Sequence, residues 1–70
     1  MSDSVYKVVE LVGSSPESWE KAAMSAIHRA SETLKDLRVA EVTGMDMHLK
    51  DGEVEFYRAR VKVSFKVKGE

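Results

Sequence analysis

The chain has no cysteine, a single proline and few aromatic residues, and these shortages remove several classes of structure. Without cysteine there is no disulfide and no thiolate metal site. No run of about eighteen apolar residues occurs, so no transmembrane helix is expected, and residues 1–4 lack the basic and apolar segments of a signal peptide. We therefore expect a cytoplasmic protein that does not engage a membrane.

A charge imbalance is also missing, because 11 basic residues stand against 12 acidic ones and the net charge is −1. Such a chain has no overall field that attracts nucleic acid or anionic lipid. The sequence motifs of nucleophilic enzymes and of phosphate-binding loops are absent as well. We expect neither a nucleic-acid partner nor enzymatic catalysis.

The length of 70 residues suits a single domain, taken here to span residues 1–70. A domain of this size buries only about 60% of the surface of its unfolded chain, which does little to offset the conformational entropy lost on folding. Apolar residues make up 43% of the chain, so a core is expected. Because disulfides are excluded, the core must be supplemented by association of copies or by a metal held through oxygen and imidazole ligands.

The apolar pattern predicts one helix after a first strand. Residues 5–12 are rich in β-branched side chains and are followed by Gly13, which predicts a strand. The segment Ser14-Ser15-Pro16-Glu17 offers a serine N-cap and a proline in the first turn, and so predicts a helix that runs to about Asp36. Its alanines predict a close approach to the sheet. The apolar positions on one face of this helix are Trp19, Ala23, Ala26, Ala30, Leu34 and Leu37.

Residues 38–50 and 53–68 predict two long strands, joined by Asp51-Gly52, a dipeptide that favours a two-residue type I′ turn. This turn fixes the register of the hairpin, and charged residues then face opposite charges while apolar residues face apolar ones. The predicted pairs are Lys50 with Glu53, Leu49 with Val54, His48 with Glu55, Met47 with Phe56, Thr43 with Arg60, Glu41 with Lys62, Val42 with Val61, and Ala40 with Val63.

In that register the apolar side of the hairpin changes near Gly44 and Tyr57. Two explanations stand: the tip buries its opposite side against another subunit, which we favour, or bulges near Gly44 shift the pleat. The order of elements predicts an α+β fold, β-α-β-β, in which a three-stranded antiparallel sheet of order 2-3-1 packs on one helix. The other face of the sheet is left bare, and there the third strand carries a basic row: Arg58, Arg60, Lys62 and Lys66.

A metal site on the hairpin has weak candidates. Asp46 and His48 are two residues apart and share a face, with Glu55 expected beside His48. Carboxylate and imidazole groups together can hold a zinc-like ion, and carboxylates repeated by symmetry can hold calcium. An ion pair between His48 and Glu55 explains the same residues without a metal, and pairing with Glu41 and Asp46 explains the basic row. We favour the ion pairs.

Three segments, in this order and with these loop lengths, resemble the dodecins over essentially the whole chain: V-Y-K-V-V-E-L-V-G-S-S-P-E-S-W-E-K-A-A, R-V-A-E-V-T-G-M-D-M-H-L and V-K-V-S-F-K-V. The resemblance implies a hollow homododecamer with helices outside and sheets inside. It also implies storage of flavins such as FMN, or in some members coenzyme A, without turnover. The S-P-x-S-W-E and R-V-A segments resemble the tryptophan-less, calcium-dodecin-like branch of the family.

The resemblance also indicates where a ligand is held. The tryptophan that stacks on flavin in flavin-binding dodecins corresponds to Val39, the glutamine that bonds the flavin edge corresponds to Arg58, and an arginine near the phosphate corresponds to Asp46. Loss of the stack removes on the order of 1 kcal/mol per ring face. We therefore expect storage of another small anionic or planar ligand, with flavin in an altered pocket, calcium binding or a purely structural assembly as alternatives. The candidate ligand-binding residues are Val39, Glu41, Asp46, His48 and Arg58.

Overall fold

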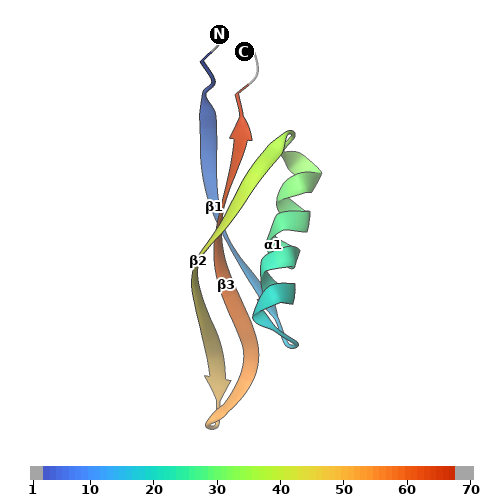
Figure 1. Ribbon diagram of the computed structural model, residues 1–70. Helices are drawn as coiled ribbons and strands as arrows, with labels where there is room; N and C mark the ends of the chain where they lie inside the picture. The colour runs from blue at the N-terminus through green and yellow to red at the C-terminus, as the bar shows by residue number, and fades with distance from the viewer. Residues whose placement is uncertain (1–2, 68–70) are drawn as a thin grey trace.

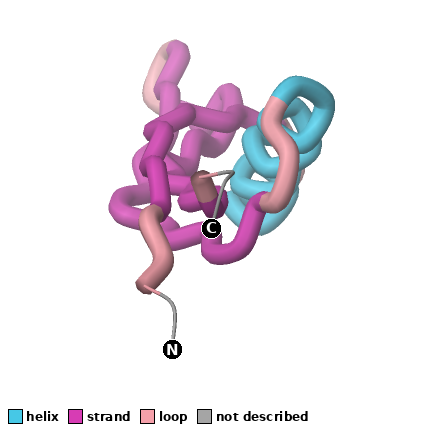
Figure 2. Tube along the Cα trace, turned by 90° about the horizontal axis from the view of Figure 1, so that it is seen from above, coloured by secondary structure: helices cyan, strands magenta, loops and turns pink. Residues whose placement is uncertain are grey.

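A three-stranded antiparallel sheet with one helix on one side is the fold of the computed structural model, which describes residues 3–67 (Figure 1). The elements are β1 (Tyr6–Ser15), α1 (Trp19–Thr33), β2 (Leu37–Lys50) and β3 (Glu53–Lys66). β3 lies between β1 and β2 and is antiparallel to both. The view along the strands shows the helix layer beside the strand layer (Figure 2). The predicted β-α-β-β fold and sheet order are confirmed; position 68, the predicted end of the last strand, lies outside the described residues.

The helix begins later than the sequence predicted. β1 continues to Ser15, which is buried and lies opposite Tyr57 in the sheet. The N-cap is Ser18, whose Oγ accepts a hydrogen bond from the Lys21 amide at 3.0 Å. The N-cap predicted within Ser14-Ser15 is therefore wrong, because pairing with β3 holds this serine segment in the sheet and Ser18 supplies the capping oxygen instead.

The helix also ends earlier, at Thr33 rather than near Asp36. The Leu34 amide still donates to the carbonyl of Ala30 at 2.8 Å, and Asp36 has a positive φ of 62° where the chain turns into β2. Leu34 and Leu37 pack against the core as predicted, but from the connection and from the first residue of β2.

Small residues bring the helix close to the sheet. Ala22, Ala26 and Ala30 are buried at four-residue spacing. Two of the three predicted alanines are therefore buried, and the third, Ala23, is partly buried and packs against the core. A Cβ on Gly13 of β1 would overlap the carbonyl oxygen of Ala22. Gly13 therefore permits the close packing and does not end the strand. The core is made of these alanines with Ala59, Val61 and Val63 of β3.

The hairpin turn is the predicted one. Asp51 and Gly52 have φ values of 54° and 81°, and both are positive as a type I′ turn requires. Next to it, Lys50 lies opposite Glu53 and Leu49 lies opposite Val54, as expected. Further in, the predicted pairs Glu41 with Lys62, Val42 with Val61 and Ala40 with Val63 are also confirmed.

Between these two regions the register is shifted by one residue. His48 lies opposite Phe56, Met47 opposite Tyr57, and Gly44 opposite Arg60, so the predicted pairs His48 with Glu55, Met47 with Phe56 and Thr43 with Arg60 are wrong. The shift is bounded by two irregularities, which leave Glu55 of β3 and Thr43 of β2 as the extra residues. A bulge on each strand cancels the other, because each adds one residue to the opposite side of the ladder.

The two bulges keep the apolar side of the hairpin on one face. Met45 lies opposite Ala59 and Val42 lies opposite Val61, and both partners are buried beneath α1. The predicted change of apolar side near Gly44 is therefore wrong, and the bulges, given as the alternative, explain the pattern.

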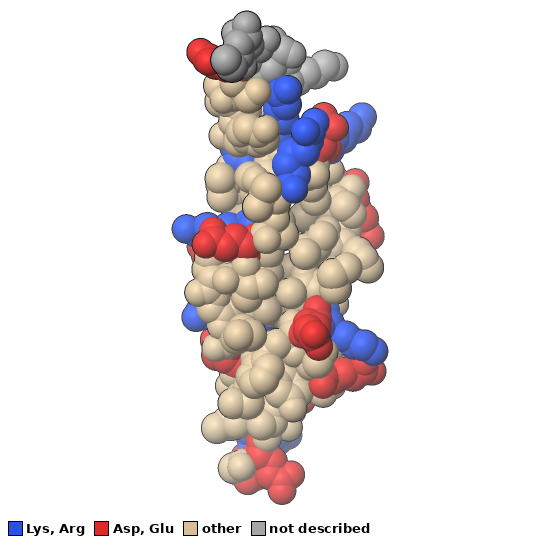
Figure 3. Space-filling view, in the orientation of Figure 1, with Lys and Arg blue, Asp and Glu red and all other residues tan. Residues whose placement is uncertain are grey.

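The hairpin is longer than the helix that covers it, and its tip extends past the end of α1 (Figure 1). We call the side chains on the helix side of this extension the apolar tip. They are large and exposed: Met45 60%, Met47 45%, Leu49 59% and Val54 43%. Uncharged side chains cover most of the face shown in Figure 3, with acidic ones gathered at the very end of the hairpin. None of the helical segments described between residues 3 and 67 is both long enough and apolar enough to cross a membrane.

Candidate ligand site on the bare face of the sheet

The five candidate residues all belong to the sheet face opposite α1, the bare face. Val39 lies opposite Ser64 and Asp46 lies opposite Arg58, and residues directly opposite in an antiparallel pair project on the same side. Val39 and Asp46 are seven positions apart, so in a regular strand their side chains would project to opposite sides. The bulge at Thr43 therefore brings both ends of the predicted site to one face. The candidates on this face are Val39, Glu41, Asp46, His48 and Arg58.

Asp46 and two arginines form a hydrogen-bonded group on this face, which we call the Asp46 cluster. Arg58 donates from Nε and Nη2 to Oδ1 and Oδ2 of Asp46 at 2.7 and 3.0 Å, and Arg60 donates from Nη1 to Oδ2 at 3.1 Å. Hydrogen bonds from Arg58, the largest effect, and from Arg60 lower the pKa of Asp46 from 3.8 to about 2. The carboxylate is therefore ionised at neutral pH, and the cluster carries one net positive charge.

Gly44 makes room for the second arginine. A Cβ at this position would lie 2.5 Å from Nη2 and 2.9 Å from Nε of Arg60. The guanidinium of Arg60 thus crosses the strand over a residue without a side chain to reach Asp46. The sequence predicted Arg60 as part of the basic row, but neither Arg60 nor Gly44 as a site residue; the two-residue spacing of Arg58 and Arg60 was the available signal.

The backbone of Asp46 is held from the opposite side by the helix. Trp19, the first residue of α1, donates its indole Nε1–H to the carbonyl oxygen of Asp46 at 3.0 Å. Its ring meets Tyr57 edge-on, with centroids 4.9 Å apart. Trp19 is half-buried and lies outside the core cluster of α1 and β3. Asp46 is therefore fixed through its backbone by α1 and through its carboxylate by β3.

His48 has two partners near the tip. Its ring stacks on Phe56 with centroids 4.7 Å apart and planes 4° from parallel. Its Nε2 lies 3.4 Å from Oε1 of Glu55, so the expected contact between these two side chains is present. The two residues are close although they are not directly opposite, because the bulge at Glu55 places this residue and Phe56 beside the same histidine.

One copy of the chain does not offer a metal site in the part that the structure describes. No group of three or more histidine, aspartate or glutamate side chains in residues 3–67 is placed to hold an ion. Both carboxylate oxygens of Asp46 already accept hydrogen bonds from guanidinium groups. A cation at Asp46 would have to displace the arginines, and a full ligand set including His48 or Glu55 would need groups from other copies.

Val39 and Glu41 lie apart from the Asp46 cluster. The partners of Val39 and Asp46 on β3 are Ser64 and Arg58, six residues apart, which corresponds to about 20 Å of strand. Val39 is 61% exposed, and Glu41 lies opposite Lys62. Within one copy the candidates therefore form two groups, an apolar one around Val39 and a charged one around Asp46.

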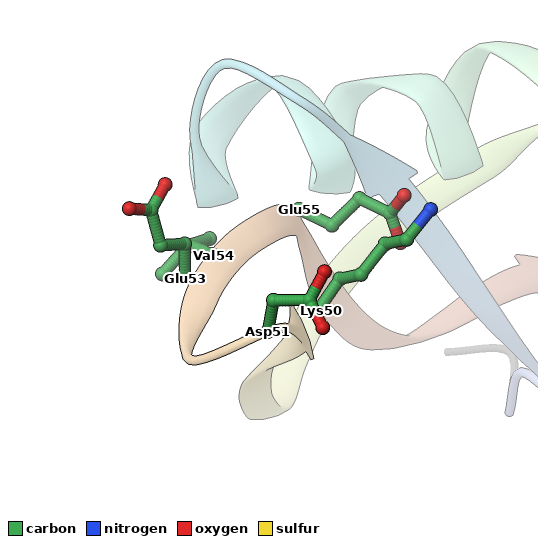
Figure 4. A pocket seen from close by; sticks show the side chains of 5 residues that line it. All are labelled: Lys50, Asp51, Glu53, Val54 and Glu55. Carbon is green, nitrogen blue, oxygen red and sulfur yellow. The ribbon is translucent and has the colours of Figure 1, made fainter.

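The hairpin turn forms a separate hollow (Figure 4). Glu53 and Val54 project to one side of it, while Asp51, Lys50 and Glu55 lie on the other, with the Lys50 ammonium directed toward Glu55. All five lining residues are exposed, so this hollow is an open part of the surface. Among the candidate residues, only Glu55 lies here.

Comparison with known proteins gives the family. The model of the dodecin family matches residues 5–68. The calcium dodecin of Mycobacterium tuberculosis is 45% identical over 65 residues, which are 93% of this chain and 92% of that protein. The dodecin of Thermus thermophilus is 38% identical over 63 residues, or 90% and 91% of the two chains. This chain belongs to the dodecin family.

Solved structures agree with this assignment. The dodecin from Streptomyces coelicolor matches with a TM-score of 0.91 and 36% identity, over 100% of both chains. The structure of the M. tuberculosis calcium dodecin, described as having a novel calcium-binding site, matches with a TM-score of 0.82 and 42% identity over 94% of each chain.

Proposed function

We propose that this protein is a non-enzymatic storage protein that assembles as a homododecameric shell, with α1 outside and the bare face of the sheet inside. In this proposal it holds a small anionic or planar ligand on the bare face, in the cytoplasm, without nucleic acid or membrane as a partner. Membership of the dodecin family supports both parts.

The exposed apolar surface is the observation that carries the assembly. The apolar tip projects past the helix with every large side chain at least 43% exposed. The bare face adds a second exposed apolar set: Val39 of β2 with Tyr6, Val8 and Val12 of β1, of which Val8 shares the partner Ser64 with Val39. Apolar surface on two sides of so small a domain is typical of a subunit rather than of a monomer.

The two groups on the bare face support a ligand with a planar or apolar part and an anionic part. Val39 offers apolar contact, and the Asp46 cluster offers guanidinium donors with one net positive charge. Because about 20 Å separates the groups along one sheet, a small ligand that uses both would lie between neighbouring copies.

Native mass spectrometry of the protein as purified tests both parts together. We expect a mass twelve times that of the 7.8 kDa chain, with additional mass from a carried ligand. A single-chain mass under gentle ionisation would contradict the assembly. A dodecamer that stays free of ligand after exposure to cell extract would contradict storage.

Flavin in an altered pocket is the nearest alternative, and it depends on Val39. An aliphatic side chain cannot replace the face of a tryptophan in a stack. We therefore expect purified protein without yellow colour and little quenching when FMN fluorescence is titrated with protein. Strong quenching would favour the flavin alternative, and Val39→Trp should then strengthen it.

Calcium binding is the second candidate, favoured by the 45% identity to the M. tuberculosis calcium dodecin. In this case Asp46 would leave its arginines and, with carboxylates from other copies, bind the cation. Calorimetric titration with calcium measures this, and a heat signal lost in Asp46→Ala but kept in Glu41→Ala would support the cation site. Absence of heat in the assembled wild type would exclude it.

A further inference from the structure

Arg58 and Arg60 hold the Asp46 carboxylate in an arrangement of donors that suits an oxyanion; we call these two guanidinium groups the oxyanion receptor. Arg58 meets the carboxylate with two parallel hydrogen bonds, and Arg60 adds a third to one of the same oxygens. Paired donors in this fork geometry are the arrangement with which arginine recognises carboxylate and phosphate groups. The Asp46 carboxylate, with three hydrogen bonds to its two oxygens, takes the place that the oxyanion of a ligand would have.

The receptor is prepared by the backbone as well as by the arginines. Gly44 gives Arg60 a path across β2 that any side chain would obstruct. The bulge at Thr43 places Gly44 opposite Arg60 and Asp46 opposite Arg58, so both guanidiniums approach the same point on the bare face. The hydrogen bond from Trp19 to the Asp46 carbonyl holds β2 in place, and it does not depend on the Asp46 side chain.

The cluster is also open to solvent. The side chains of Arg58 and Arg60 are 44% and 45% exposed, and that of Asp46 is 34% exposed. A free anion can therefore reach the guanidiniums without rearrangement of the fold. Exposed ion pairs are weak enough for exchange with a competing anion.

We propose that Arg58 and Arg60, positioned over Gly44, bind the oxyanion group of a small ligand, and that the Asp46 carboxylate competes with this group as an internal stand-in and so sets its affinity. The inference deepens the proposed function and rests on it for the biological ligand. It makes Asp46 a specificity-determining residue, because the ligand must bind the two arginines more strongly than the Asp46 carboxylate does.

The test measures binding of inorganic phosphate to the assembled protein by calorimetry at constant ionic strength, for the wild type and for Asp46→Asn. Asparagine keeps the backbone carbonyl that Trp19 needs and removes the charge that competes. We expect phosphate to bind about fivefold tighter to Asp46→Asn, the factor that one favourable exposed ion pair carries. Asp46→Ala should show the same gain in phosphate affinity, so the measurement can still be made if one of the two variants assembles poorly.

Glu10→Gln is the matched control, because it removes one carboxylate from the same face, opposite Lys62, at an exposed residue outside the candidate site. If phosphate affinity rises as much in Glu10→Gln as in Asp46→Asn, the effect is one of net charge and the inference is overturned. Adding Arg60→Gln to Asp46→Asn should abolish the gain, and a gain that persists would also overturn it. Acetate as a second probe tells a carboxylate ligand from a phosphate ligand.

The outcomes separate this inference from the proposed function. A dodecamer that carries a ligand, with no gain for either anion in the Asp46 variants, would retain the storage function and remove the oxyanion receptor. A gain in phosphate affinity in a protein that does not form a shell would retain the oxyanion receptor and remove the storage function.

Discussion

Leu49→Asp should prevent assembly by removing a contact between copies, not by damaging the core of one copy. Leu49 lies on the apolar tip, beyond the end of α1, and is 59% exposed in one copy. Its side chain contributes little to the subunit's own core, which consists of alanines of α1 and buried residues of β3. An aspartate at this position would therefore leave the core contacts of one copy unchanged and act where another copy covers the tip.

The magnitude follows from the exposed area. Covering the exposed part of a leucine stabilises an assembly by about 1 to 2 kcal/mol per copy. Burying an unpaired carboxylate in its place adds a desolvation cost of several kcal/mol. Because a closed shell repeats the contact in every copy, the change should remove the assembled state at micromolar concentration.

Light scattering coupled to size-exclusion chromatography measures the outcome, with circular dichroism to follow the fold. Ser25→Asp is the matched control, since it adds the same charge at an exposed position of α1, on the side that we place outside. We expect the control to keep the wild-type mass and Leu49→Asp to give small species. Unchanged assembly of Leu49→Asp would refute the assignment of the apolar tip as an interface.

Three further changes test the fold and the site. Gly13→Ala forces a methyl group against the Ala22 carbonyl and should lower the free energy of unfolding by about 1 to 3 kcal/mol in urea denaturation; stability equal to wild type would contradict the close packing. Trp19→Phe removes the hydrogen bond to Asp46 and should lower stability by about 1 kcal/mol by the same assay, and no loss would mean that this bond does not support β2. The pKa of Asp46 is about 2 in the fold against 3.8 as a free group, so its contribution is complete above pH 3.8 and is lost as the pH falls toward 2. The stability difference between wild type and Asp46→Asn should therefore shrink over that interval, and a difference that grows toward low pH would contradict the ion pairs.

The elements of the fold could be predicted because each has a local cause. Apolar residues at spacings of three and four predict the helix, and Asp51-Gly52 predicts the hairpin turn. The start of the helix could not be predicted, because Ser15 and Ser18 are equally suitable capping residues in the sequence. Pairing of Ser15 with Tyr57 across the sheet decided between them.

The five candidate residues were predicted as one ligand site and share one face of the sheet, but the geometry of the contacts among them was not predicted. A register derived from the turn holds only until the first bulge, and bulges depend on how both strands pack against the helix. Counted from the turn, the shift at Glu55 set both Asp46 opposite Arg58 and Gly44 opposite Arg60, and the bulge at Thr43 restored the register of the turn. Pairing of the basic row with Asp46 was expected, but the three hydrogen bonds that define the cluster depend on that shifted register.

The central claim is that one copy exposes too much apolar surface on the two faces of its sheet to exist alone. Sedimentation velocity across a dilution series, with circular dichroism on the same samples, tests it most directly. We predict that the assembled species persists on dilution and that any single chains released lose their ordered structure. A well-folded single chain at low concentration would contradict the claim.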